Sequence, residues 1–188
     1  MKNFILHHND PDGYCAAWLV QEYIESVDER GWADRMEIAY GRPLPEDMFK
    51  ADRVYILDFS LDPDDMRKLV ESVGAENIVW IDHHESAIQK YEGFEHDIPG
   101  IRDVDFAACH LAYAYVYAQR FGQPLDVFST DWLRCMPLYI RLVGDYDCWL
   151  WKKPEYPDVE AEKVNAFHYG LNAFCWKNPG FWQSFRSG

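Results

Sequence analysis

The sequence predicts an α/β fold in which a mostly parallel β-sheet is flanked by helices and followed by a helical C-terminal part. Two observations predict this class. Short apolar runs alternate with helical patterns over the first hundred residues, an order typical of parallel sheets with helical crossovers. After Gly100 the pattern is helical only, and no repeat or low-complexity linker interrupts it.

The spacing of apolar residues gives the order of the elements. Strands are expected at residues 4–6, 36–40, 54–57 and 78–81. Helices are expected at residues 14–27, 61–73, 106–121, 132–143 and 159–174. We expect one catalytic domain over residues 1–150 and a helical extension over residues 151–188 that packs on it.

Composition excludes several classes of protein. The 188 residues carry a net charge of −14, which argues against binding of long nucleic acid, because that binding depends on Lys and Arg at phosphates. No run approaches the ~20 apolar residues of a membrane span. The first apolar run, residues 4–6, is too short for a secretory signal, so we expect a cytoplasmic protein. Five scattered cysteines are expected to be reduced and buried.

Ionisable side chains follow three of the predicted strands. Residues 8–12 (HNDPD) follow the first, Asp58 the third, and Asp82, His83 and His84 the fourth. The carboxyl ends of parallel strands meet at one edge of the sheet, where ligands bind. Clustered carboxylates repel one another unless a cation lies among them, and Asp with His is a ligand set for Mn²⁺ or Mg²⁺. The sequence therefore predicts a metal site, with enough ligands for two ions.

The first turn has a spacing that fits this site. His8, Asp10 and Asp12 alternate, so in an extended turn their side chains point to related faces. The same alternation places His7 on the other face, outside the predicted metal site. Gly13 is expected to leave room for the backbone to approach a ligand.

Further carboxylates occur near the end of a predicted helix. Asp145 and Asp147 lie in an apolar context and are both candidates for a fourth contribution. Simpler interpretations exist for the other groups: residues 8–13 could form an Asx-type turn, and Asp58 could cap a helix. Asp82, His83 and His84 are harder to explain that way, because adjacent charge beside a buried strand is costly without pairing or metal.

The segments HNDPDG, YILDFS, VWIDHHES and LVGDYDCW resemble, in this order, the motifs of the DHH phosphoesterase superfamily. The resemblance covers about residues 4–149 and looks closest to the oligoribonuclease (nano-RNase-like) members. It implies a Rossmann-like sheet and two Mn²⁺ ions, with Mg²⁺ or Co²⁺ as possible substitutes.

The resemblance also implies roles for individual residues. The implied metal ligands are His8, Asp10, Asp12, Asp58, Asp82, His83 and Asp145, with Asp147 as the alternative to Asp145. Asp58 would bridge the ions. Asp82 would be a ligand or would orient the histidines, and His84 would contact the phosphate; these two form the expected catalytic pair. Gly13, Arg141 and His110 are further candidates for substrate contact. A solvated arginine is an equally good interpretation of Arg141, and a partly buried structural histidine is the better interpretation of His110.

The reaction implied is hydrolysis of phosphodiester bonds in small nucleotides such as short oligonucleotides, by a water activated by two metal ions. The alternatives are a pyrophosphatase-like phosphoanhydride hydrolase and a non-catalytic metal- and nucleotide-binding protein. One departure concerns substrate recognition: family members carry a second, Gly-rich domain, whereas only about forty residues follow Trp149 here. A homodimer partner is one way to close the cleft.

Overall fold

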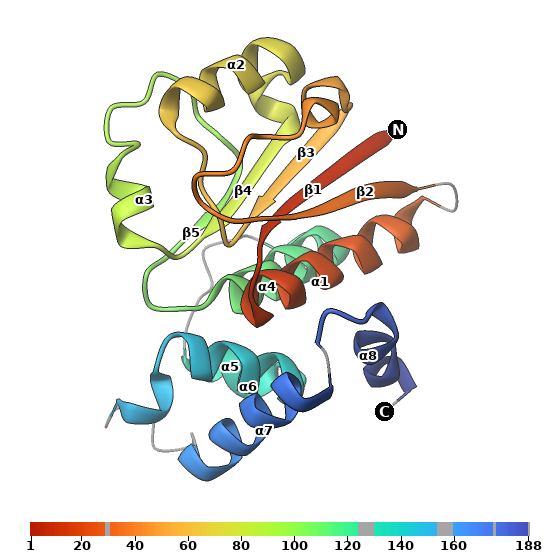
Figure 1. Cartoon of the computed structure of the whole chain (residues 1–188), viewed down its shortest axis with the longest axis vertical. Coiled ribbons are helices and arrows are strands. Elements are labelled where there is room, and N and C mark those ends of the chain that lie inside the picture. Colours follow the sequence, from red (N-terminus) through yellow and green to blue (C-terminus); the bar gives the residue numbers. More distant parts are fainter. Residues whose placement is uncertain (29–30, 124–129, 154–159, 175, 188) are drawn as a thin grey trace.

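In the computed structural model, the described residues are 1–28, 31–123, 130–153, 160–174 and 176–187. Five parallel strands form the central sheet in the order β2-β1-β3-β4-β5 (Figure 1). Their bounds are β1 Lys2–His8, β2 Trp32–Ile38, β3 Arg53–Leu57, β4 Ile78–Asp82 and β5 Gly100–Arg102. The predicted α/β class with a parallel, Rossmann-like sheet is confirmed.

The helices cover both faces of this sheet. They are α1 Pro11–Val27, α2 Pro63–Val73, α3 Glu85–Gln89, α4 Ala108–Phe121, α5 Thr130–Cys135, α6 Leu138–Asp147, α7 Ala161–Phe174 and α8 Pro179–Gln183. Figure 1 shows α2 and α3 on one side of the sheet and α1 with α4 on the other. Helices α5 to α8 form a further layer beyond α1 and α4, and α6 contacts α1, α4 and α7.

Alternation along β1 divides the core into two parts. Ile5 packs in the core that includes α1 and α4, whereas Phe4 and Leu6 pack in the core that includes Met66 of α2. Successive side chains of a strand point to opposite faces, so an apolar run without alternation fits a strand that is buried on both sides. This explains why the strand patterns read as continuous apolar runs.

Several boundaries differ from those predicted. Helix α1 begins at Pro11, three residues early, because Asp10 accepts a hydrogen bond from the Gly13 amide and proline suits the first helical turn. The helix predicted over residues 132–143 is two helices, α5 and α6, separated at Pro137. Strand β2 begins four residues early, and the short elements α3 and β5 were not predicted. Position 159, the predicted start of a helix, lies outside the described residues.

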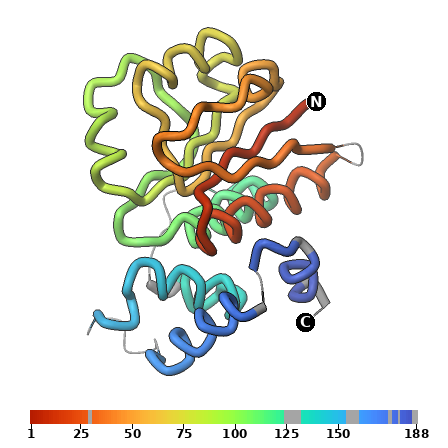
Figure 2. The backbone as a smooth tube through the Cα atoms, viewed as in Figure 1, coloured from red at the N-terminus to blue at the C-terminus, as the bar shows by residue number. Residues whose placement is uncertain are grey.

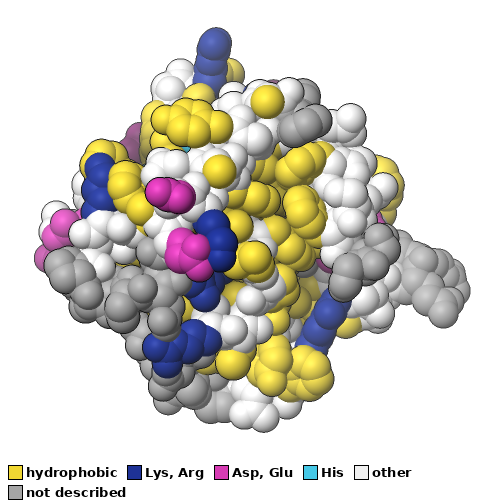
Figure 3. Space-filling view, turned by 90° about the horizontal axis from the view of Figure 1, so that it is seen from below, with side chains coloured by type: hydrophobic (Ala, Val, Ile, Leu, Met, Phe, Trp, Pro, Cys, Tyr) yellow, Lys and Arg dark blue, Asp and Glu magenta, His cyan; other side chains and the backbone are white. Residues whose placement is uncertain are grey.

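The C-terminal helices pack on the core beside α1. Trp182 is completely buried, and its ring stacks near that of Trp18 at a centroid distance of 6.3 Å. Lys177 donates hydrogen bonds to Asn9 at 2.6 Å and to the Glu37 carboxylate at 3.0 Å. Figure 2 shows the chain that leads into α8 passing beneath α1. Seen from below, apolar side chains gather in the middle of the face (Figure 3).

The cysteines depart from the expected burial. Cys15 and Cys109 are buried, but Cys135 is exposed and Cys148 is half-buried. Cys175 lies outside the described residues. None of the helices in the described ranges combines the length and apolar character that crossing a bilayer requires.

Candidate metal centre

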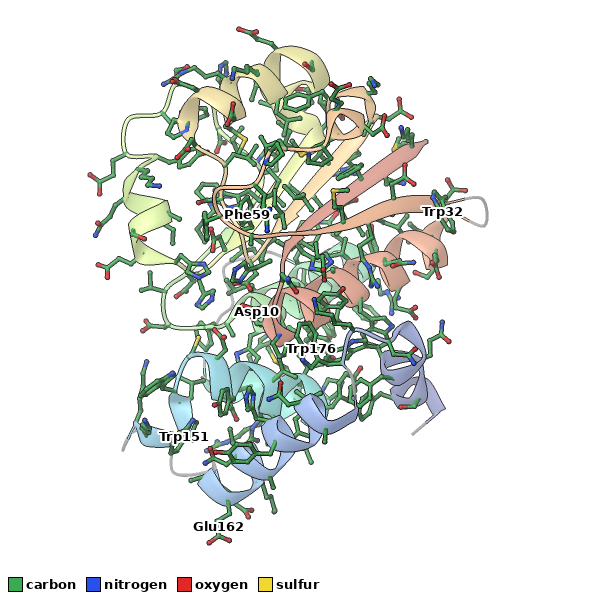
Figure 4. All side chains as sticks on the ribbon, viewed as in Figure 1. Asp10, Trp32, Phe59, Trp151, Glu162 and Trp176 are labelled. Atoms are coloured by element: carbon green, nitrogen blue, oxygen red, sulfur yellow. The ribbon has the colours of Figure 1, made fainter. Side chains whose placement is uncertain are left out.

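The segments that follow β1, β3 and β4 meet at the carboxyl edge of the sheet, next to the last turn of α6. Figure 4 shows Asp10 between this edge and the helical layer beneath it. Parallel pairing of β1 with β3 and of β3 with β4 holds the three strand ends in register. Residues that are far apart in the sequence are thereby brought into one cluster.

One half of the cluster is built around His8. Its Nδ1 lies 2.5 Å from Asp10 Oδ2 and 3.7 Å from Asp58 Oδ2. The other oxygen of Asp10 accepts the Gly13 amide at 2.9 Å. Asp10 is therefore held in place by the start of α1 while its second oxygen faces His8.

The other half is built around His83. Its Nε2 lies 3.1 Å from Asp58 Oδ1 and 3.3 Å from Asp147 Oδ2. It also lies 3.7 Å from Asp12 Oδ2. Asp58 thus faces both halves, one carboxylate oxygen to each.

Asp12 connects the cluster to α4. Its carboxylate accepts the backbone amides of Ala108 and Cys109, each at 2.8 Å. These amides belong to the first turn of α4, where unpaired N–H groups favour an anion. Each carboxylate oxygen of Asp12 therefore accepts a backbone hydrogen bond from α4, and the side chain also lies near His83.

Asp82 lies beneath His84 and is completely buried. Its Oδ1 accepts the Nδ1–H of His84 at 2.7 Å and the backbone amide of His83 at 2.8 Å. Its Oδ2 accepts the indole N–H of Trp80 at 3.2 Å. With its carboxylate bonded within the protein, Asp82 fixes the tautomer and orientation of His84, whose side chain remains 35% exposed.

The two aspartates at the end of α6 occupy different environments. Asp147 lies beside His83. Asp145 is buried and accepts from Arg141 Nε at 3.3 Å, one helical turn away. Among the described residues, Asp145 belongs to none of the groups of side chains that could hold a metal.

The remaining candidates lie around the cluster rather than in it. His110 is completely buried, and its Nε2 pairs with the Arg141 carbonyl at 3.3 Å. A Cβ on Gly13 would lie 2.5 Å from the carbonyl oxygen of His8. Gly13 therefore lets α1 approach the end of β1, where the sequence had indicated room for a ligand.

Cys148 is a neighbour of the cluster that the sequence analysis did not single out. Its Sγ lies 3.6 Å from His83 Nδ1. Because Nε2 of His83 faces the carboxylates, this contact is made by the opposite edge of the ring. The only sign in the sequence that Cys148 lies near the cluster was its position next to Asp147.

The side chains of the first half perturb one another's proton affinity. Pairing with the carboxylates of Asp10 and Asp58 raises the pKa of His8 to about 10. Burial by itself raises the pKa of Asp10, but the hydrogen bonds from His8 and the Gly13 amide outweigh it and lower the pKa to about 2. Without a bound cation, this close contact favours a protonated His8 beside an ionised Asp10.

In the second half, burial acts on the histidine and on the carboxylates in opposite directions. It lowers the pKa of His83, but pairing with Asp58 and Cys148 outweighs it and raises the pKa to about 12. Burial and the charge of Asp12 raise the pKa values of Asp58 and Asp147. Crowded carboxylates resist ionisation until positive charge neutralises them.

The donor set fits metal ions. Both oxygens of Asp58 are buried, and within the described part of the chain neither accepts a well-aligned hydrogen bond. Three groups bring ligand atoms within 4.8 Å of one another: His8, Asp10 and Asp58; Asp58, His83 and His84; and His83, Asp147 and Cys148. A buried carboxylate without such hydrogen bonds is costly, and carboxylate with imidazole suits Mn²⁺ and Mg²⁺.

His7 and His8 offer a direct test of the register of β1. His7 is buried on the opposite face, where its Nδ1 donates to the His8 carbonyl at 2.8 Å and its ring packs on Tyr14. We expect His8→Ala to weaken Mn²⁺ binding about tenfold or more, as loss of a group that supports a metal does. His7→Ala should lower the melting temperature by leaving a cavity and retain Mn²⁺ affinity.

The two variants are compared by Mn²⁺ titration calorimetry and by thermal melting with a chelator present. Equal losses of Mn²⁺ affinity would contradict the register of β1.

Asp147 and Asp145 provide a second matched pair. We expect Asp147→Asn to weaken Mn²⁺ binding about tenfold or more, because it removes a carboxylate that faces His83. Asp145→Asn should change stability through the pairing with Arg141 and leave Mn²⁺ affinity unchanged. Electron paramagnetic resonance of free Mn²⁺ gives both affinities, and a larger loss in Asp145→Asn than in Asp147→Asn would reverse the assignment.

No protein-family model matches the chain, and no curated protein matches it. A solved structure of an uncharacterized protein from Helicobacter pylori G27 is similar, with a TM-score of 0.55 and 18% identity over 81% of this chain and 44% of that chain. What the two share is the fold. The chain spans less than half the length of that protein.

Two solved structures of the exonuclease RecJ also align. RecJ in complex with Mn²⁺ from Thermus thermophilus gives a TM-score of 0.47 and 16% identity, over 77% of this chain and 21% of that chain. Exonuclease RecJ bound to manganese gives a TM-score of 0.46 and 14% identity, over 77% and 38%. Scores at this level support no statement about activity.

Proposed function

We propose that this chain is a metal-dependent phosphoesterase of the DHH type, which hydrolyses phosphodiester bonds in small nucleotides such as short oligonucleotides. The observation that carries the proposal is the position of Asp58. Its two oxygens face His8 on one side and His83 on the other, and this is the arrangement expected of a carboxylate that bridges two ions.

The described side chains divide between two ions. His8, Asp10 and Asp58 would hold one, and Asp58, His83 and Asp147 the other. Mn²⁺ is the proposed metal, with Mg²⁺ or Co²⁺ as substitutes, because the set mixes imidazole with carboxylate. When bound, such ions lower the pKa of water and neutralise charge on phosphoryl oxygens.

His84 would act on the substrate. Its Nδ1–H is committed to Asp82, so its Nε2 is the atom available to a phosphoryl oxygen. The Asp82 carboxylate stabilises the protonated form of the ring, since its hydrogen bond and its charge raise the pKa of His84. A protonated His84 would donate a hydrogen bond where negative charge develops on the phosphoryl group.

The size of the substrate follows from charge. With a net charge of −14, the protein repels an extended polyanion, whereas one or two phosphates can be held by bound cations. The charge therefore favours short nucleotides over long nucleic acid.

The test is a panel of substrates incubated with Mn²⁺: a di-ribonucleotide, a cyclic dinucleotide, a generic phosphodiester and pyrophosphate. Mn²⁺-dependent turnover of a nucleotide diester is expected. Turnover of pyrophosphate alone would establish the phosphoanhydride hydrolase instead. Metal binding without any turnover would favour the alternative of a non-catalytic metal- and nucleotide-binding protein. An unchanged melting temperature with Mn²⁺ would exclude the metal site, because a ligand that binds the native state stabilises that state.

A further inference from the structure

A cavity of about 190 Å³ adjoins the metal centre between the start of α1 and the facing sides of α6 and α7. One side of it is formed by Asp10, Asp12 and Asp147. Two of these carboxylates belong to different halves of the cluster, so the cavity opens directly onto the centre. The side chains proposed to hold metal line only one side of this cavity and do not fill it.

The other side of the cavity is apolar and aromatic. Leu142 and Leu171 line it together with the rings of Tyr146 and His168. These rings come from α6 and α7 and stack face to face, with centroids 3.4 Å apart and planes 7° from parallel. They form a flat aromatic pair that joins the two helices.

His168 is a neutral member of this pair. Asn172, one turn further along α7, donates to its Nε2 at 3.0 Å, which places the ring proton on Nδ1. Burial also lowers the pKa of His168. The side chain is therefore a neutral ring with an N–H donor, unsuited to pairing with a phosphate and suited to stacking and hydrogen bonding with another ring.

We infer that this cavity is the nucleobase subsite of the enzyme, in which a base of the substrate packs against Tyr146 and His168 while its phosphate lies at the metal centre. The inference rests on the proposed function and names the part of the substrate that the metals do not hold. Bases stack on aromatic side chains whatever the sequence, because every base has a π-face.

The size and chemistry of the cavity select this occupant. A drug-sized ligand needs about 300 Å³ or more, so the cavity accepts one ring system and not a longer chain. Its apolar lining offers nothing to a second phosphate or to pyrophosphate.

Helix α7 follows the four motifs in the sequence and lines this cavity with His168 and Leu171. In this inference, the chain after Trp149 therefore supplies part of substrate recognition.

The test uses three variants on α7. His168→Ala removes the ring, His168→Phe retains a ring, and Tyr169→Ala is the matched control, because the neighbouring Tyr169 is 68% exposed and does not line the cavity. With a di-ribonucleotide, His168→Ala should raise KM about tenfold, as loss of one base-stacking contact does, with kcat little changed. Phe should restore most of the loss, and Tyr169→Ala should behave as the unaltered protein.

A base-free analogue separates base recognition from a general defect. For a matched abasic dinucleotide, KM should already be high in the unaltered protein and should not rise further in His168→Ala. If His168→Ala raises KM equally for both substrates, the residue supports the fold and the inference is wrong. Melting temperatures identify any variant that fails to fold.

Direct binding gives a readout that does not depend on turnover. By calorimetry with Mn²⁺ present, AMP should bind about tenfold more tightly than ribose 5-phosphate, and His168→Ala should abolish the difference. Equal affinities in the unaltered protein would overturn the subsite. The proposed function fails separately, if no nucleotide diester is hydrolysed in the substrate panel.

Discussion

Asp58→Asn is expected to abolish the Mn²⁺-dependent rise in melting temperature and to lower Mn²⁺-dependent hydrolysis by about 10³-fold or more, equivalent to several kcal/mol of transition-state stabilisation. Asp58 is the carboxylate that faces both His8 and His83. An amide is neutral and keeps only one oxygen, so the substitution removes the charge shared by both proposed ion positions and leaves an oxygen for one of them at most.

The substitution should leave the fold intact. Asp58 has a φ of 55°, a backbone conformation that Asn adopts more readily than most residues. Asn also removes a buried negative charge without changing the size of the side chain. With a chelator present, Asp58→Asn should therefore melt no lower than the unaltered protein, which separates loss of the metal from loss of the structure.

The matched control is Asp62→Asn, the same chemical change four residues later at the start of α2. Asp62 is 76% exposed, and its side chain makes no capping hydrogen bond. Melting curves with and without Mn²⁺ should be those of the unaltered protein. If Asp58→Asn binds Mn²⁺ as tightly as Asp62→Asn does, the bridging role of Asp58 is excluded.

Gly13→Ala should disrupt the metal centre although it alters no ligand. The added Cβ would lie 2.5 Å from the carbonyl oxygen of His8 and 3.0 Å from its carbonyl carbon and amide nitrogen. These are backbone atoms of β1 that cannot rotate away, so the start of α1 must move. The hydrogen bond from the Gly13 amide to Asp10 moves with it.

We expect Gly13→Ala to lower the free energy of unfolding by about 1–3 kcal/mol, the usual cost of overpacking. Mn²⁺ affinity should fall about tenfold or more, because Asp10, which faces His8, lies on the displaced segment. Urea unfolding with a chelator present measures the first quantity and Mn²⁺ calorimetry the second.

Gly170→Ala on α7 is the control for the chemical change. A Cβ at Gly170 would have no atom within 4 Å, and Ala in place of Gly inside a helix adds about 0.5–1 kcal/mol of stability. Gly170→Ala should therefore be neutral or stabilising and should bind Mn²⁺ normally. A Gly13→Ala protein with the same properties would show that the approach of α1 to β1 tolerates a side chain.

Much of the fold was predictable because local patterns match tertiary needs. The apolar runs of β1, β3 and β4 are buried on both sides of a parallel sheet, and a charged group at the end of such a run has only the sheet edge to occupy. The convergence of His8, Asp58 and His83 follows from this geometry. Strand β5 was missed because three residues, one of them Gly100, carry no strand pattern.

By itself, the sequence determined the α/β class, the parallel sheet and the residue types at its carboxyl edge, because hydrophobic periodicity and strand ends are local properties. Only the tertiary structure placed Asp147 beside His83 and paired Asp145 with Arg141. Side chains that are two residues apart on a helix point in directions that differ by about 200°. One of these two aspartates therefore faces the cluster and the other does not. Which one depends on how α6 is rotated against α4, and that rotation is set where Gly144 packs closely on the buried ring of His110.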